Sequence, residues 1–314
     1  MPELPEVQTT VNGIKRVAVG KKIVDVWTDY DSPFHTGKDN IKNPEYFKKF
    51  RKAIIGTKIM GSTRRAKNIL IHLSNKQTIL LHMKMTGHLM FGKYEFDKKK
   101  TRDPWAPSKE NKNFEALNDS FNKWIHFVLE LSDAKHLVLS DMRKFGKVTL
   151  LPTDTLDTSS ELKDIGPEPL EKDFTLEVFK ERIGKKPNGK IKTVLMDQSL
   201  IAGIGNIYSD EVLWRAGLHP EEKVLNIPEK YFKPMLEAIK STLLKGIDFG
   251  GDSMSDYRNI DGERGKFQDH HQAYRKTHKP CTKKGCKGVI TRKVVGGRSA
   301  HFCNEHQQPL KAKS

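Results

Sequence analysis

Hydrophobic residues recur with two different periods along this 314-residue chain, and the change of period divides it into regions. Near the start they follow helical spacing, so residues 5–17 are predicted to form an amphipathic helix. From about residue 22 to 151, short β-rich runs alternate with turn residues, which predicts a sandwich or barrel. The predicted strands are Ile23–Trp27, Ile69–Leu73, Ile79–Met83, Phe127–Leu131, Leu137–Leu139 and Val148–Leu151.

The strand pattern is interrupted once and then gives way to helical periodicity. Residues 93–123 are polar and lysine-rich, and we interpret them as a long surface loop. Residues 152–173 are rich in Pro, Asp, Thr and Ser, a composition typical of a linker. Further on, a helix is predicted to open at Pro228, followed by a Gly- and Asp-rich loop at 246–268. The other predicted helical faces contain Leu176, Phe179 and Ile183, then Val212, Leu213 and Ala216.

The charge balance narrows the choice of partner. Hydrophobic residues make up 36% and charged residues 30%, as in ordinary globular proteins, and no run approaches the roughly 18 apolar residues of a membrane span. The start lacks the pattern of a secretory signal, so we expect a cytoplasmic protein. The net charge is +17, and residues 271–314 hold eleven Lys or Arg against one acid. Such an excess of positive charge can serve to bind nucleic acid, to bind an anionic membrane, or to keep the protein soluble. The clustering of the charge near the C-terminus favours nucleic acid as the partner, so we expect association with the nucleoid.

All three cysteines lie close together near the C-terminus. Cys281, Cys286 and Cys303 fall within 23 residues, and an odd count argues against a disulfide framework. With His306 they form the pattern Cys-x4-Cys-x16-Cys-x2-His, which suits one structural zinc ion on a β-hairpin. Packed free cysteines are the alternative. The other candidates for the fourth ligand are His278 and His301.

Three short motifs have both a structural and a nucleic-acid interpretation. Glycines precede a predicted helix in Ala202–Tyr208, where backbone N–H groups and Asn206 can approach a phosphate, unless this is a plain tight turn. The turn Arg64–Lys67 precedes a strand, and composition alone favours a solvated surface there. Phe145, between cations in Arg143–Gly146, is either a core residue or a wedge that enters a base step.

The N-terminus offers a nucleophile. Removal of Met1 would expose Pro2, whose secondary amine titrates near about pH 8 and is partly unprotonated at neutral pH. Such an amine can attack a carbon with carbonyl character and form an iminium. Glu3 and Glu6 lie beside it and can transfer protons. The alternative is that Pro2 is merely an exposed terminus and that both glutamates are charges in the first turn of the helix.

Taken together, these motifs resemble the formamidopyrimidine-DNA glycosylases of the Fpg/Nei family. The resemblance begins with Met1–Val7, and Leu4 in place of Gly favours the Fpg branch. It implies an α+β multidomain fold with DNA between the domains. Their expected bounds are 1–151 for a β-sandwich with a leading helix, 152–268 for a linker and helix-two-turn-helix domain, and 269–314 for a zinc finger. The other matching motifs are Arg64–Lys67, Met85–Gly87, Arg143–Gly146, Gly166–Leu170, Met196–Glu211 and the cysteine cluster.

The resemblance also implies an activity. It predicts a monomeric bifunctional glycosylase and AP lyase that needs no small-molecule cofactor. The enzyme would excise oxidised purines such as 8-oxoguanine from damaged double-stranded DNA by β,δ-elimination. Pro2 would be the nucleophile, Glu3 the acid that protonates the sugar ring oxygen and Glu6 a supporting acid. Lys67, grouped with these catalytic residues, would hold a phosphate, as would His82, Asn206 and Arg298. The residues that would fill the gap left by the flipped nucleotide are Met85, Arg143 and Phe145.

The chain departs from the family pattern in four places. The first cysteine pair is spaced x4 rather than x2, and His306 stands where the family usually has a fourth cysteine. Residues 93–123 exceed the usual loop, and Tyr274–Lys276 replaces a more usual Tyr-Gly-Arg. The region after Gly250, which corresponds to a lesion-capping loop, also differs. Two other functions stay open: a Nei-type enzyme for oxidised pyrimidines, and an inactive DNA-binding protein, against which the retention of Pro2, Glu3 and Lys67 argues.

Overall fold

A computed structural model describes residues 1–32, 35–254 and 256–310. By its contacts the chain divides into two compact units, which we call unit 1 (residues 1–163 and 249–266) and unit 2 (residues 164–248 and from 267 onward). The segment 249–266 therefore belongs with the N-terminal part of the chain, although it follows the helices of unit 2. The three expected domains, with bounds at 151/152 and 268/269, stay a prediction.

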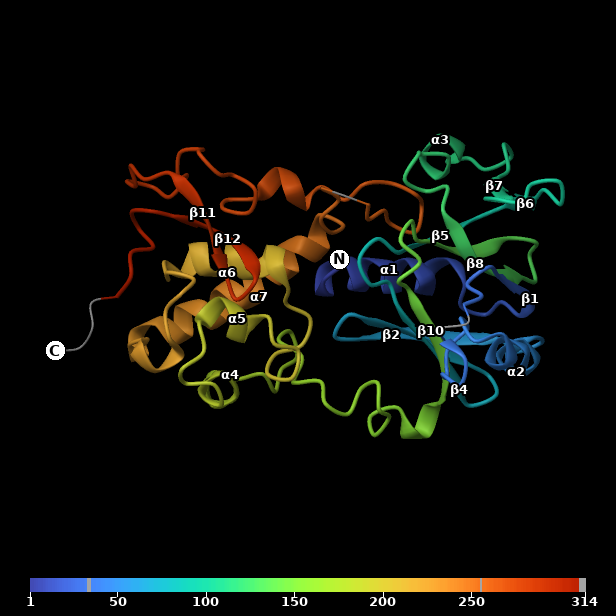
Figure 1. The fold of residues 1–314 in the computed structure, drawn as a ribbon, viewed down its shortest axis with the longest axis horizontal. Coiled ribbons are helices and arrows are strands. Elements are labelled where there is room, and N and C mark those ends of the chain that lie inside the picture. The colour runs from blue at the N-terminus through green and yellow to red at the C-terminus, as the bar shows by residue number, and fades with distance from the viewer. Residues whose placement is uncertain (33–34, 255, 311–314) are drawn as a thin grey trace. The chain divides into compact units, whose positions relative to one another are not determined.

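Two four-stranded antiparallel sheets form the body of unit 1 (Figure 1). Their strand orders are β1-β8-β9-β5 and β10-β4-β3-β2. The expected sandwich is confirmed, with two strands, β2 and β5, that the hydrophobic pattern did not predict. The strands are β1 (Ile23–Thr28), β2 (Ile59–Arg65), β3 (Asn68–Leu73), β4 (Gln77–His82), β5 (His88–Gly92), β8 (Ile125–Leu131), β9 (His136–Ser140) and β10 (Lys147–Pro152).

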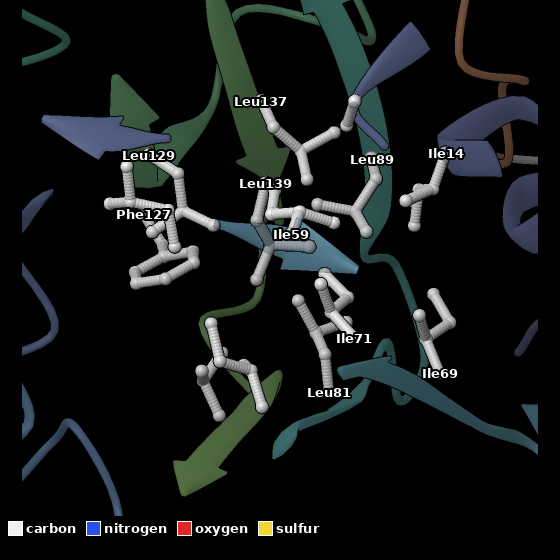
Figure 2. Packing of buried hydrophobic residues seen from close by; sticks show 14 of the residues in the cluster. Ile14, Ile59, Ile69, Ile71, Leu81, Leu89, Phe127, Leu129, Leu137 and Leu139 are labelled. Carbon is white, nitrogen blue, oxygen red and sulfur yellow. The ribbon is translucent and has the colours of Figure 1, made fainter. Parts of the chain in front are cut away.

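Alternate residues of both sheets meet in one hydrophobic core. Figure 2 shows Ile69 and Ile71 of β3 in the same cluster as Leu137 and Leu139 of β9. This period of two is the pattern of a strand with one face turned inward. The apolar face of helix α1 (Leu4–Val17) closes the cluster, which includes Ile14. A second helix of this unit, α2 (Pro44–Ile54), is capped by Asn43, whose side chain accepts the N–H of Glu45.

The outer face of the first sheet is also covered. Residues 93–123 are not the long loop that we expected, because they contain a small hairpin of β6 (Tyr94–Phe96) and β7 (Trp105–Pro107) and a helical turn, α3 (Phe114–Leu117). Together with the sheet they build a second hydrophobic cluster, which explains why β8 and β9 are apolar on both faces. Its buried members are Met90, Tyr94, Leu117, Ile125, Val128 and Val138.

Unit 2 combines helices with a C-terminal hairpin. Its helices are α4 (Leu176–Gly184), α5 (Ile191–Leu195), α6 (Asn206–Ala216) and α7 (Phe232–Asp248), and its hairpin joins β11 (Ile290–Val295) to β12 (Arg298–Cys303). Helix α6 packs against α5, α7 and β12. The helix expected from Pro228 is corrected, because a 3₁₀ turn at Glu229–Tyr231 comes first. Other 3₁₀ turns lie at Thr153–Thr155, Val224–Asn226 and Phe267–His270.

The fold class expected from the sequence is confirmed: a mixed α/β chain with an N-terminal sandwich, a helical region and a C-terminal hairpin that bears the cysteines. Among the described residues, every helix is too short or too polar to cross a membrane.

Candidate functional site

The first helix begins at the predicted catalytic residues. Glu3 is the N-cap of α1, and its backbone N–H donates to Oε2 of Glu6 at 2.7 Å. The Glu3 side chain accepts from the backbone of the same turn, which completes a capping box. Both carboxyl groups are buried, with exposed fractions of 2% for Glu3 and 1% for Glu6, and Pro2 is buried beside them. The start of the helix therefore gathers Pro2, Glu3 and Glu6 in one place.

The Glu6 carboxyl group has unusual acid–base properties. A second backbone donor, the N–H of Asp252, reaches its Oε1 at 2.7 Å. Burial, and next the charge of Glu3, raise the pKa of Glu6 to about 7, although both N–H donors act in the opposite direction. A carboxyl group with this pKa exchanges its proton at neutral pH, as a general acid or base must. Shifts of this kind concentrate at sites of chemistry.

The segment that carries Asp252 approaches Glu6 closely. Gly251 has a φ of +86°, and a Cβ there would lie 2.9 Å from Cγ of Glu6, so the position requires glycine. The Tyr257 hydroxyl donates to the carbonyl oxygen of Glu6 at 3.0 Å. Sequence reasoning did not include Gly251, Asp252 or Tyr257 among the site residues. The resemblance had placed all three in the region after Gly250 that corresponds to a lesion-capping loop, without assigning a role to any of them.

Lys67 and His82 lie at one end of the second sheet. Lys67 is 5% exposed and follows Ala66, whose φ of +51° makes the tight turn between β2 and β3. The Arg64 guanidinium donates to the Ala66 carbonyl oxygen at 3.0 Å and so fixes this turn. Burial, and next the charges of Lys84 and Lys67, lower the pKa of His82 to about 3. The imidazole of His82 is therefore neutral at pH 7.

The hydrogen bond to His82 also defines its tautomer. The backbone N–H of Lys84 donates to Nδ1 of His82 at 2.9 Å, so the ring proton is on Nε2. His82 thus offers an N–H donor without a positive charge. This chemistry suits a hydrogen bond to a phosphate oxygen, as the resemblance implied for this residue.

Two turns present exposed side chains and share one buried anchor, Asp141. Its Oδ1 accepts the hydroxyl of Thr86 at 2.5 Å, and its Oδ2 accepts the N–H of Gly146 at 2.6 Å. Thr86 in turn accepts the N–H of Arg143 at 3.2 Å. A fully buried carboxyl group therefore ties the turn after Met83 to the turn at 142–146. Sequence reasoning missed Asp141, whose only signal was a polar residue at the end of an apolar strand.

The three predicted gap-filling side chains lie on these turns. Met85 is 39% and Phe145 46% exposed, which overturns the alternative that Phe145 is a core residue. The Arg143 guanidinium lies 4.4 Å from the centre of the Phe145 ring, a cation–π contact worth roughly 0.5–1 kcal/mol at an exposed site. An exposed aromatic ring on a pinned turn is suited to insertion between bases.

In unit 2 the glycine motif leads directly into α6. Gly203 has a φ of +85°, and its N–H donates to Oε1 of Gln198 at 2.9 Å. Nε2 of Gln198 spans the same turn by donating to the Ile204 carbonyl oxygen at 2.7 Å. The helix then starts at Asn206, whose Oδ1 is buried without a hydrogen-bond partner among the described residues. This ordered turn and the positive end of a helix form a surface for an anion.

A buried ion pair lies next to the start of α6. The Lys192 ammonium, fully buried, donates to Oδ1 of Asp210 at 2.5 Å and to the hydroxyl of Ser209 at 3.2 Å. Oδ2 of Asp210 accepts the backbone N–H of His301 at 2.9 Å and contacts its Nδ1 at 3.0 Å. Asp210 therefore connects α5 and α6 to the C-terminal hairpin. Sequence reasoning missed Lys192 and Asp210 because neither carries a pattern of its own.

The three cysteines meet one histidine. The ligand atoms of Cys281, Cys286, Cys303 and His306 lie within 4.8 Å of one another and could hold a metal ion. His301 is not the fourth member, since it contacts Asp210. Nε2 of His306 donates to the carbonyl oxygen of Trp214 at 3.0 Å, so Nδ1 is left to face Cys281 Sγ at 3.4 Å.

The sulfur atoms of this cluster accept backbone donors. The N–H groups of Lys283, Gly288 and Glu305 lie 3.5, 3.4 and 3.4 Å from Cys281, Cys286 and Cys303 in turn. These N–H groups point at the sulfur atoms, which a metal binds as thiolates. Gly288 leaves room for the cluster, because a Cβ there would lie 2.6 Å from Cys303 Sγ. The longer x4 spacing therefore does not prevent the four ligands from converging.

The hairpin also presents the predicted phosphate-binding arginine. Arg298 is exposed and follows the turn Gly296–Gly297, where both residues have positive φ. The two-residue hairpin turn whose twist best matches that of the strands requires a positive φ at both central residues. Arg298 and Asn206 belong to unit 2, whereas the other predicted DNA contacts belong to unit 1. The functional roles of all of these residues stay predictions.

Comparisons with known proteins agree with this arrangement over nearly the whole chain. The family model described as the formamidopyrimidine-DNA glycosylase N-terminal domain matches residues 1–148, and that described as the H2TH domain matches residues 165–258. A formamidopyrimidine-DNA glycosylase of Streptococcus mutans is 36% identical, over 98% of this chain and 100% of the relative. That of Bacillus subtilis is 35% identical, over 98% and 99%. The chain therefore belongs to the formamidopyrimidine-DNA glycosylase family.

Solved structures give the same result. Lactococcus lactis Fpg in complex with DNA that contains an abasic site has a TM-score of 0.79 and 31% identity, over 98% of this chain and 99% of that one. MutM in complex with DNA that contains carbocyclic 8-oxo-G also has a TM-score of 0.79, with 32% identity over 98% and 100%. The fold of this chain is thus that of its family.

Proposed function

We propose that this protein is a DNA glycosylase and AP lyase of base excision repair that removes oxidised purines from double-stranded DNA. The observation that carries the proposal is the start of α1, where Pro2, Glu3 and a Glu6 carboxyl group with a pKa near 7 lie together. The family membership and the DNA complexes of relatives support it. The enzyme would work as a monomer at the nucleoid in the cytoplasm.

The proposed chemistry starts when Met1 is removed and the amine of Pro2 becomes free. Its nitrogen lone pair attacks C1′ of the damaged nucleotide, and the glycosidic bond breaks. The Pro2 nitrogen then loses its proton, and the oxidised base leaves with one proton gained, so the step is balanced. Glu3 donates a proton to the ring oxygen, so that the sugar opens and an iminium forms between Pro2 and C1′. Loss of the proton at C2′ then expels the 3′ phosphate, and a second elimination expels the 5′ phosphate.

The remaining residues would hold the DNA. Lys67, His82, Asn206 and Arg298 would contact phosphates, which position the duplex without reading its sequence. Met85, Arg143 and Phe145 would fill the gap that the flipped nucleotide leaves, which offsets part of an unstacking cost of roughly a few kcal/mol. Cys281, Cys286, Cys303 and His306 would bind one zinc ion, whose contribution is structural. Metal analysis should find about one zinc per chain.

Borohydride trapping tests the proposal. Protein with a processed N-terminus should form a covalent adduct with an 8-oxoguanine duplex, mapped to Pro2, and protein that retains Met1 should form none. An adduct at Lys67 would overturn the role of Pro2, and the absence of both adduct and strand cleavage would leave a DNA-binding protein. A duplex panel separates the remaining alternative, because faster excision of oxidised pyrimidines would indicate a Nei-type enzyme.

A further inference from the structure

Residues 93–123, which we call the arm, contact residues 249–254 and 256–266, which we call the strap, within unit 1. Nδ2 of Asn113 donates to the Asp261 carbonyl oxygen at 2.8 Å, and Nδ2 of Asn122 donates to the Gly262 carbonyl oxygen at 3.2 Å. In Figure 1 the strap, in orange, passes close to α3 of the arm. Gly262 permits this approach, since a Cβ there would lie 2.9 Å from the Ala116 carbonyl oxygen.

Arg258 of the strap is enclosed by the arm. Its side chain is 3% exposed, its guanidinium carbon lies 4.7 Å from the centre of the Phe121 ring, and its Nη2 lies 3.5 Å from Asp119. Its Nη1 donates to the Tyr257 carbonyl oxygen at 2.9 Å. A buried guanidinium needs opposite charge and hydrogen-bond acceptors, because its desolvation is costly. Asp119 supplies charge from the arm, so the two segments depend on each other.

Asn122 joins the strap to a second functional turn. The side chain is 1% exposed, and besides Gly262 it bonds the Ala116 carbonyl oxygen at 2.7 Å. Its Oδ1 lies 2.8 Å from Nε2 of His88, a buried residue just after the turn that carries Met85. One amide therefore fixes the arm, the strap and the start of β5, and every polar atom of this amide has a partner.

The other end of the strap touches the candidate catalytic group. Asp252 donates its N–H to Glu6, and the hydroxyl of Tyr257 donates to the Glu6 backbone. Tyr257 is also the residue whose carbonyl oxygen binds Arg258. A short chain of contacts thus runs from Asp119 through Arg258 and Tyr257 to Glu6.

We propose that the arm is a brace that holds the strap against Glu6, and that Asp119 and Asn122 are positioning residues for base excision. The inference rests on the proposed function, because it takes Glu6 and the adjoining strap as parts of the excision site. The placement of the strap affects excision, because a damaged base has to be kept in position until its bond to the sugar breaks. A preformed abasic site has no base, so its cleavage places a smaller demand on the strap.

The ratio of two rates tests the brace. Asn122→Ala should lower single-turnover excision of 8-oxoguanine about 10-fold, since small misplacements at a reacting centre are costly. Cleavage of a preformed abasic duplex should stay within about two-fold of wild type. Asp119→Asn, which keeps the side-chain shape and removes the charge, should act in the same direction and serves if Asn122→Ala does not fold. A residue that only supports the fold would lower both rates alike and leave their ratio unchanged.

Glu110→Ala is the matched control. Glu110 is on the same arm and pairs with Lys93 at 2.6 Å in an exposed position, so both rates should match wild type. Wild-type protein that traps no adduct would overturn the proposed function. Wild-type protein that traps normally, combined with Asn122→Ala and Asp119→Asn variants whose ratio is unchanged, would overturn the brace alone.

Discussion

Each of the two units buries charged side chains, but with different neighbours. In unit 1, Glu6 lies near a like charge, Glu3, and its pKa rises to about 7. In unit 2, the equally buried Lys192 and Asp210 are opposite charges in direct contact at 2.5 Å, and Oδ2 of Asp210 also accepts the backbone N–H of His301. The same degree of burial therefore leads to a group that can change its protonation state in one unit and to a fixed ion pair in the other.

This difference distinguishes a group that is suited to proton transfer from a pair that stabilises the fold. Two acidic groups that are buried close together disfavour each other's charged form, which raises the pKa. Shifts of this kind are concentrated at sites where a proton is transferred. A paired buried charge with all its hydrogen bonds made is costly to break and fixes the elements that supply it. The carboxyl group of Glu6 in unit 1 is thus expected to influence the rate of reaction, and the ion pair in unit 2 to influence the stability of the fold.

The largest expected effect is that of Glu3→Gln in unit 1. Glutamine keeps the shape of the side chain but cannot donate a proton to the sugar ring, so excision should fall about 10⁴-fold. Single-turnover kinetics measure the rate, and a binding titration with the same lesion duplex should give an affinity close to wild type. Excision that survives at more than a tenth of the wild-type rate would remove Glu3 from the mechanism.

Next in size is the substitution Asp210→Ala in unit 2. It leaves the Lys192 ammonium buried without its carboxylate and should lower the free energy of unfolding by about 4 kcal/mol. Denaturant unfolding measures this loss. The double variant Lys192→Met with Asp210→Leu should recover much of it, because apolar residues of similar volume often replace a buried pair without loss. A double variant no more stable than Asp210→Ala would contradict the ion-pair interpretation.

The third prediction concerns pH and Glu6. Its pKa is about 7 in the folded protein against 4.5 ordinarily, so the folded state binds the proton more tightly. This contribution to stability is present below pH 4.5 and is lost as the pH rises through 7, a change of about 3 kcal/mol. Unfolding of wild type and Glu6→Gln at pH 5 and pH 8 measures it. The variant should lose less stability than wild type between these two values, and parallel curves would place the Glu6 pKa near its ordinary range.

Much of this molecule was predictable because its signals are local. The strands around Ile71 and Leu137 follow a period of two, and the cysteine spacing predicted the cluster with His306 that could hold a metal ion. The contacts that the sequence did not predict join segments that lie far apart in the chain. Asp252 meets Glu6 across 246 residues, and Asp210 meets His301 across 91. The hydrophobic pattern carries no signal for such pairs, because each consists of two single polar residues that become buried only when the chain folds.

The arm shows a second reason for failure. Residues 93–123 are polar in composition, and polarity suggested a loop. The evidence against a loop was in other strands, since β8 and β9 are buried along nearly their whole length and so need cover on both faces. A sheet with two apolar faces predicts a covering element, and in this chain Tyr94 and Leu117 supply it.

The smallest expected effect tests whether the exposed ring of Phe145 contributes specificity rather than stability. Because this ring is 46% exposed, Phe145→Ala should leave the melting temperature nearly unchanged. Without the wedge, less of the unstacking cost is offset, so the ratio of affinities for damaged and intact duplex should fall about 10-fold. Lys67→Ala and Asn206→Ala provide the contrast: they should weaken both affinities alike, because phosphate contacts carry no information about the base. If Phe145→Ala weakened both duplexes equally, the ring would count as one more general contact, and discrimination would have to come from Met85 or Arg143.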